Sequence, residues 1–105
     1  MNGIIVAPTI IMRFTFDANK DAANIVKHGL TLADAPMVFD APDKLTLISP
    51  QGNEPRLLDV AMVELAGVVL VLVYVLREPD EVRAISLRRA SKTERNLYAS
   101  WQETR

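Results

Sequence analysis

The chain has 105 residues, 50% of them hydrophobic and 24% charged, which is enough for one domain with a buried core. Twelve Lys and Arg residues against 13 Asp and Glu residues give a net charge of −1, which argues against a wholly basic nucleic-acid-binding protein. The absence of cysteine excludes disulfides and cysteine-based metal centres, and the single histidine excludes a multi-histidine metal site. The longest apolar run, residues 65–75, is about half of the roughly 20 residues that a membrane span needs. We therefore expect a soluble, cytoplasmic domain without a membrane segment.

Residues 1–11 form an apolar segment without a charged side chain. A secretory leader needs a basic start, a longer apolar stretch and a small-residue cleavage site, and this segment is not convincing as one. Two interpretations stay open, an additional strand leading into the domain or an extension that precedes a second start at Met12. We expect residues 1–11 to be a short, strand-like extension and residues 12–105 to be a single domain that carries the function.

The sequence pattern at the start of this domain predicts a strand followed by a helix. Residues 13–16 alternate polar and aromatic side chains, as a short strand does. Asp17 is a typical helix N-cap, and apolar residues recur at helical spacing over residues 18–27. Gly29 ends this helix, because glycine readily adopts the positive φ angle that is common just after a helix.

A second, shorter helix is predicted from Thr31 to about Phe39. Thr31 and Asp34 resemble a capping box at its start, and the sequence Ala41-Pro42-Asp43 ends it. Pro36 would cost about 3 kcal/mol inside a regular helix, so the helix is expected to begin later than Thr31 suggests.

The remainder of the chain predicts strands and a final helix. We expect strands at residues 45–49, 56–62, 68–75 and 82–88, with turns between them. Ser91 and Glu94 have the spacing of a capping box and predict a last helix. The order of strand, two helices, four strands and helix predicts an α+β domain, in which an antiparallel sheet is flanked by helices.

Positive charge collects in one segment, residues 83–95, where five cationic side chains stand against one carboxylate. Four of the five are arginines, whose planar guanidinium groups suit phosphate. If Ile85 and Leu87 point into the core, strand alternation places Ala84, Ser86 and Arg88 on the other face. We expect an open, basic sheet face that could bind single-stranded RNA, with an ordinary solvated charged face as the alternative.

Four segments of the chain, taken together and in order, resemble the BrnT toxins of bacterial type II toxin–antitoxin systems. They are FTFDANKDAANIVKHGL (14–30), VFDAP (38–42), the arginine in NEPRLLDVAM (53–62) and RAISLRRASKTERNLYAS (83–100). The sequence departs from the family pattern at Phe16, where tryptophan is usual, at Pro36, and at Asp59, where a neutral residue is common. The resemblance covers residues 12–100, which is most of the chain.

The resemblance implies a RelE-like fold and a metal-independent ribonuclease that requires no cofactor and inhibits translation. It also implies a BrnA-like antitoxin partner with a ribbon-helix-helix DNA-binding fold. That partner would neutralise the toxin, and operator DNA would be bound only through it. The alternative function is a catalytically silent module that binds RNA or protein with the same basic face.

Metal-independent RNA cleavage needs a base for the ribose 2′-OH, cations for the phosphate and an acid for the leaving oxygen. His28 is the leading acid–base candidate, because its unperturbed pKa lies near neutrality. Its alternative role is to bind the last carbonyls of its helix. Arg56 and Arg88 are the predicted phosphate clamps, which completes the predicted catalytic set.

Four further residues are candidates for binding RNA or the partner, namely Lys27, Arg83, Arg89 and Tyr98. Lys27 and the two arginines could equally be solvated, and Tyr98, at helical spacing, could equally be a core residue. No residue is predicted to bind a metal.

Overall fold

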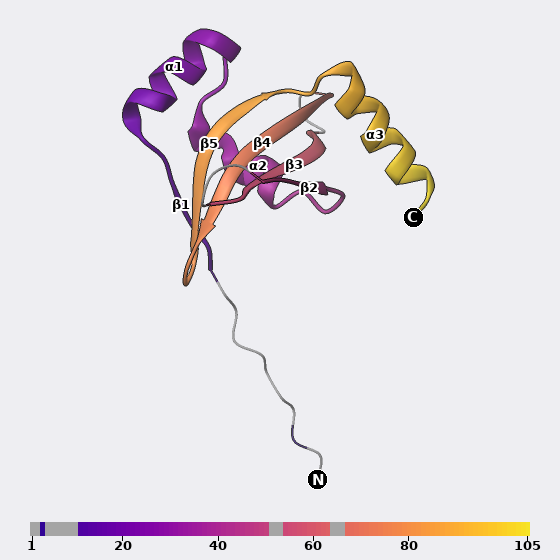
Figure 1. Cartoon of the computed structure of the whole chain (residues 1–105), viewed down its shortest axis with the longest axis horizontal. Coiled ribbons are helices and arrows are strands. Elements are labelled where there is room, and N and C mark those ends of the chain that lie inside the picture. The colour runs from indigo at the N-terminus through magenta and orange to yellow at the C-terminus, as the bar shows by residue number, and fades with distance from the viewer. Residues whose placement is uncertain (1–2, 4–10, 51–53, 64–66) are drawn as a thin grey trace.

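The computed structural model describes residues 3, 11–50, 54–63 and 67–105 (Figure 1). The predicted strand-like extension at residues 1–11 lies almost entirely outside these residues, as do most of the two turns predicted after residues 49 and 63. The described elements are β1 (Arg13–Thr15), α1 (Ala18–His28), the 3-10 helix η1 (Leu32–Asp34), α2 (Ala35–Phe39), β2 (Leu45–Ser49), β3 (Arg56–Val63), β4 (Val68–Arg77), β5 (Glu81–Arg89) and α3 (Lys92–Glu103).

The strands form a five-stranded sheet in the order β1-β5-β4-β3-β2. Strands β2 to β5 are antiparallel neighbours, whereas the short β1 pairs in parallel with β5. The predicted α+β class and order of elements are confirmed, and the one parallel pair makes the sheet mixed. No helix in the described part of the chain is both long and apolar enough to cross a membrane.

The helix ends follow the predicted capping residues. The Asp17 carboxylate accepts a hydrogen bond from the Lys20 backbone N–H at 3.0 Å, and Gly29 ends α1 with φ 72°. Ser91 and Glu94 form the predicted capping box of α3. Pro36 lies in the first turn of α2, where a backbone N–H has no partner within the helix, so the proline is tolerated and the helix begins at Ala35.

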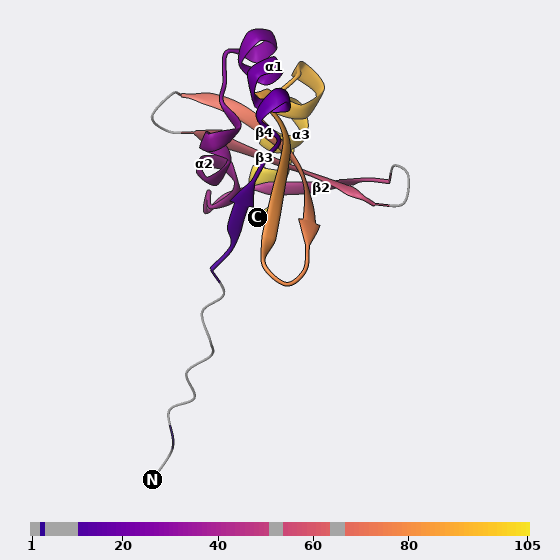
Figure 2. The ribbon, with the colours of Figure 1, turned by 90° about the vertical axis from the view of Figure 1, so that its left-hand side faces the viewer.

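Helices cover both faces of the sheet. On one face, η1 and α2 contribute Leu32 and Val38 to a core that includes Leu72 of β4. On the other face, Tyr98 of α3 packs with Val60 and Val71. Figure 2 shows α2 to the left of β1 and β5, and the two core clusters place α3 against the opposite face.

A β-bulge in β5 changes the predicted alternation of its side chains. Val73 pairs with Ser86 but the next residue of β4, Tyr74, pairs with Ala84, so Ile85 is an extra residue in β5. Ala84 and Leu87 are therefore both buried in the core on the α2 face. The prediction that Ala84 lies on the open face is wrong, because simple alternation does not survive the insertion of one residue.

Candidate functional site

Helix α1 and the bulged part of β5 border a shallow hollow of about 240 Å³, here called the α1–β5 hollow. Its lining residues are Lys20, Ala23, Asn24, Lys27, His28, Ile85 and Ser86. Two lysines and the only histidine of the chain thus border one small surface depression. This composition suits a ligand that carries negative charge.

His28 is the last residue of α1 and is partly exposed. Partial burial, followed by the positive charges of Lys27 and Arg88, lowers the pKa of its imidazole below 6.5. The ring is therefore neutral near pH 7 and able to accept a proton. No hydrogen bond joins the ring to another described residue, and the helix end is closed instead by the Gly29 N–H, which donates to the Ile25 carbonyl.

Arg88 lies on β5 opposite Val71, on the face that α3 covers. Its guanidinium group donates two hydrogen bonds to the Glu94 carboxylate, from Nη1 to Oε1 at 2.7 Å and from Nη2 to Oε2 at 2.8 Å. The two side chains are only 28% and 15% exposed. Glu94 thus neutralises much of the positive charge of Arg88, which was predicted to bind an RNA phosphate. The same ion pair joins β5 to the start of α3.

The Arg88–Glu94 pair should make the stability of the protein depend on pH in the acidic range. Hydrogen bonds from Arg88 are the main reason that the pKa of Glu94 falls from 4.5 to about 2, with the Ser91 backbone N–H adding to the effect and burial opposing it. Because the pKa is lower in the folded state, the stabilisation is complete above pH 4.5 and is lost as the pH falls toward 2. We expect Glu94→Gln to lower the free energy of unfolding at pH 7 by on the order of 2 kcal/mol.

Urea unfolding at pH 7 and at pH 3 measures this effect. The difference between the variant and the original protein should shrink at pH 3, where the original protein has lost part of the same interaction. Glu103→Gln, at the exposed end of α3, is the matched control and should change neither value. An equal loss of stability for Glu94→Gln at both pH values would contradict the assignment.

Arg56 does not lie with His28 and Arg88. It is the first residue of β3, four positions before Val60, and Val60 is connected through Val71 of β4 to Arg88 of β5. Strand dimensions then separate the Arg56 and Arg88 backbones by about 15 Å. The two arginines therefore do not form a clamp around one phosphate.

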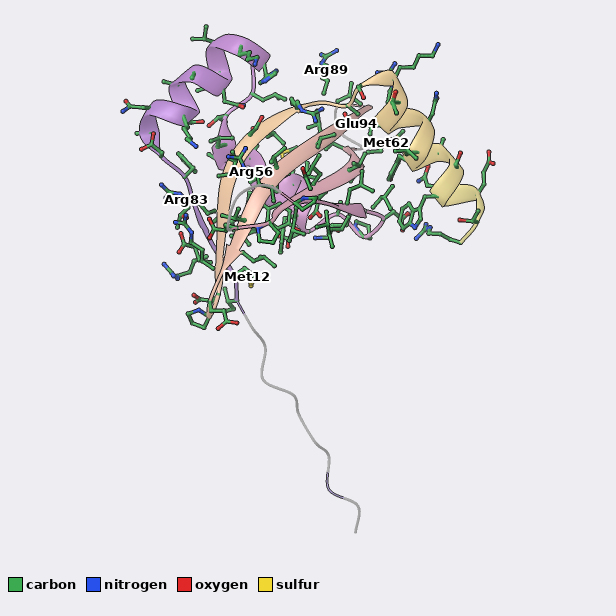
Figure 3. The ribbon with its side chains drawn as sticks, in the orientation of Figure 1. Met12, Arg56, Met62, Arg83, Arg89 and Glu94 are labelled. Atoms are coloured by element: carbon green, nitrogen blue, oxygen red, sulfur yellow. The ribbon has the colours of Figure 1, made fainter. Side chains whose placement is uncertain are left out.

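Arg56 shares the open end of the sheet with Arg83 instead. Arg83 pairs with Val75, and Leu57 pairs with Tyr74, so Arg56 and Arg83 lie on either side of β4 at nearly the same level. Strand alternation places both side chains on the same face as Arg88, about 10 Å apart. Figure 3 shows Arg83 and Arg89 at opposite ends of β5, with Arg89 close to the start of α3.

Two of the remaining candidates have different surroundings. Lys27 is exposed beside His28 and borders the hollow. Tyr98 is 3% exposed, and its hydroxyl donates to the Asp43 carbonyl at 2.8 Å. Tyr98 therefore belongs to the α3 core, as the alternative interpretation held, and it is not a proton donor for a ligand in the hollow. It borders a separate cavity of about 460 Å³ between α2 and α3, near Met62 in Figure 3.

Sequence reasoning missed Asn24 and Lys20 as residues of this site. Asn24 is the only buried residue of α1, and its amide bonds to β5. A signal was present, because asparagine is unfavourable inside a helix and implies a specific hydrogen-bonding role there. Within the described residues, no group of three or more His, Cys, Asp or Glu side chains is placed to hold a metal ion.

Comparison with known proteins connects this arrangement to a family. The family model described as "Ribonuclease toxin, BrnT, of type II toxin-antitoxin system" matches residues 16–94. The crystal structure of the Brucella abortus ribonuclease toxin BrnT has a similar fold, with a TM-score of 0.58 and 23% sequence identity, and the match covers 77% of this chain and 99% of that chain. A comparison with curated proteins gives no match. The matched residues include the whole α1–β5 hollow and the Arg88–Glu94 pair.

Proposed function

Because the chain belongs to the BrnT family of ribonuclease toxins of type II toxin–antitoxin systems, we propose that it cleaves RNA without a metal ion at the α1–β5 hollow and thereby inhibits translation. The observation that carries this proposal is that His28 borders the same hollow as Lys20 and Lys27. Its pKa, lowered from 6.5 mainly by partial burial, agrees with a ring that is neutral near pH 7. A neutral imidazole supplies a base at pH 7, and ammonium groups nearby stabilise negative charge on a phosphate.

In the proposed cleavage reaction, the 2′-oxygen of a ribose displaces the 5′-oxygen of the next nucleotide from the phosphorus. His28 takes the proton of a ribose 2′-OH, and the 2′-oxygen then forms a bond to the adjacent phosphorus. The bond from phosphorus to the 5′-oxygen breaks, and this oxygen leaves with a proton from the imidazolium or from water in the open hollow. The products are a 2′,3′-cyclic phosphate and a free 5′-hydroxyl. Lys20 and Lys27 stabilise the charge that develops on the phosphate oxygens.

The arginines away from the hollow suit the rest of a single RNA strand. Arg56 and Arg83 are partly exposed on one face, about 15 Å from the Arg88 region by strand dimensions. That separation exceeds the reach of one phosphate group, so these arginines bind neighbouring phosphates of a strand several nucleotides long. Arg89, exposed at the end of β5, is assigned to RNA or to the partner protein.

Membership of a type II family implies an antitoxin partner. We propose that this partner is a BrnA-like protein with a ribbon-helix-helix fold, and that operator DNA is bound only through it. We further propose that the substrate is cytoplasmic RNA and that the protein acts in the cytoplasm.

A cleavage assay in the presence of a chelator tests the function. The purified protein, incubated with a single-stranded RNA in EDTA, should yield fragments that end in a 2′,3′-cyclic phosphate, at the same rate as with Mg²⁺. Loss of cleavage in EDTA that Mg²⁺ restores would contradict metal independence. Binding of the RNA without any cleavage would favour the alternative, a catalytically silent binding module on the same basic face.

A further inference from the structure

Apolar burial does not fix α1 on the sheet. Asn24 is the only buried residue of the helix, at 6% exposed, whereas its neighbours Ile25 and Val26 are 46% and 88% exposed. Figure 1 shows α1 beside the end of β5 that is followed by α3. A helix that buries so little apolar surface needs another interaction to set its position.

The Asn24 side chain supplies that interaction by bonding to β5 as a neighbouring strand would. Its Nδ2 donates to the Leu87 carbonyl at 2.8 Å, and its Oδ1 accepts from the Leu87 backbone N–H at 3.2 Å. β1 pairs with β5 only as far as Arg83, so the Asn24 amide occupies the sheet edge farther along the strand. Two more bonds complete its surroundings, to the Leu30 carbonyl at 2.8 Å and from the Ser86 hydroxyl at 3.3 Å.

The two hydrogen bonds between the Asn24 amide and the Leu87 backbone fix both the position of α1 along β5 and its rotation about its own axis. His28 follows Asn24 by four residues, so the two side chains lie on the same side of the helix, one turn apart. Anchoring Asn24 at Leu87 therefore brings His28 to Ser86 in the α1–β5 hollow. The same anchor keeps the His28 ring close to Arg88, which directly follows Leu87 in β5.

We propose that Asn24 is the positioning residue of this site, and that its amide sets the register of α1 on β5 and thereby holds His28 at the hollow. The part of this inference that concerns cleavage rests on the proposed function. The part that concerns the register of the helix does not.

The variant Asn24→Ala tests the inference by nuclear magnetic resonance in the full chain. The amide proton of Leu87 should exchange with solvent at least ~10-fold faster, because it loses its hydrogen bond to Asn24 Oδ1. The pKa of His28 should rise toward 6.5, because the ring moves away from the burial and from the charge of Arg88, both of which lower this pKa. Lys20 and Lys27 are on the same helix and move with the ring. RNA cleavage should fall by about 10-fold or more, since small misplacements of a catalytic group are costly.

Thr31→Ala is the matched control. It removes the bond of 3.0 Å from the Thr31 hydroxyl to Asp21, which also anchors α1 but does not reach β5. It should lower the stability while leaving the Leu87 exchange rate and the His28 pKa unchanged. If Asn24→Ala does not fold, Asn24→Gln replaces it, because glutamine keeps the amide but lengthens its reach and should move the His28 pKa in the same direction.

The outcomes separate the two claims. A folded variant with unchanged Leu87 exchange and unchanged His28 pKa would overturn the positioning role, whatever the cleavage rate. If both NMR quantities change but the unsubstituted protein does not cleave RNA, the positioning role stands and the proposed function fails.

Discussion

Replacement of His28 by alanine is expected to lower the rate of RNA cleavage by about 100-fold to 10,000-fold, the range typical of a lost general base. The fold should survive, because the ring is partly exposed and makes no hydrogen bond to another described residue. Single-turnover cleavage of one RNA measures the rate, and circular dichroism with urea unfolding confirms that the variant is folded. Expression of the same variant in bacteria should no longer arrest growth.

The pH dependence of cleavage gives an independent readout of the same residue. A base must be unprotonated to act, so the rate should rise with pH and level off above the pKa of His28, with a midpoint below 6.5. Removing the neighbouring charge by Lys27→Met should move the midpoint upward, toward the ordinary value. A midpoint that does not respond to Lys27→Met, or a fully active His28→Ala, would show that another group removes the proton.

The parts of the fold that the sequence predicted correctly depend on local interactions. Asp17, Gly29 and Ser91 act on backbone groups within a few residues of themselves, so their spacing was sufficient to place the helix ends. The bulge at Ile85 could not be predicted in this way. It is a property of the pairing between β4 and β5, and a single strand with regular alternation carries no sign of it.

The sequence offered candidate site residues by their chemistry but could not place them in space. His28 was identified from its chemistry, and it does border a basic hollow. Arg88 and Glu94 lie six residues apart, and the turn between a strand and a helix brings their side chains together. Arg56 and Arg88 were both predicted as phosphate clamps, but the register of three strands separates them. Such distances follow only from the order and register of the sheet.

Asp59 shows how a departure from the family pattern can be accommodated by its neighbours. Its carboxylate is fully buried on β3, and it accepts hydrogen bonds from Lys44 Nζ at 2.7 Å, Thr46 Oγ1 at 2.7 Å and the Tyr74 hydroxyl at 3.0 Å. Burial, and then the charge and hydrogen bond of Asp59, raise the pKa of Tyr74. Lys44 also lies 3.8 Å from the centre of the Phe39 ring. The buried charge is thus compensated from two strands and a loop.

Breaking this network should destabilise the protein more than any other single change considered above. Asp59→Ala leaves the Lys44 ammonium and the Tyr74 hydroxyl without their acceptor, in surroundings from which water is largely excluded. We expect the free energy of unfolding to fall by about 3–5 kcal/mol, as when one partner of a buried ion pair is removed. Urea unfolding at pH 7 measures the loss, and Thr46→Val, which removes one neutral donor, should cost only about 1 kcal/mol. A loss below about 1 kcal/mol for Asp59→Ala would mean that water or a rearranged side chain replaces the carboxylate, and that the network does not hold β2, β3 and β4 together.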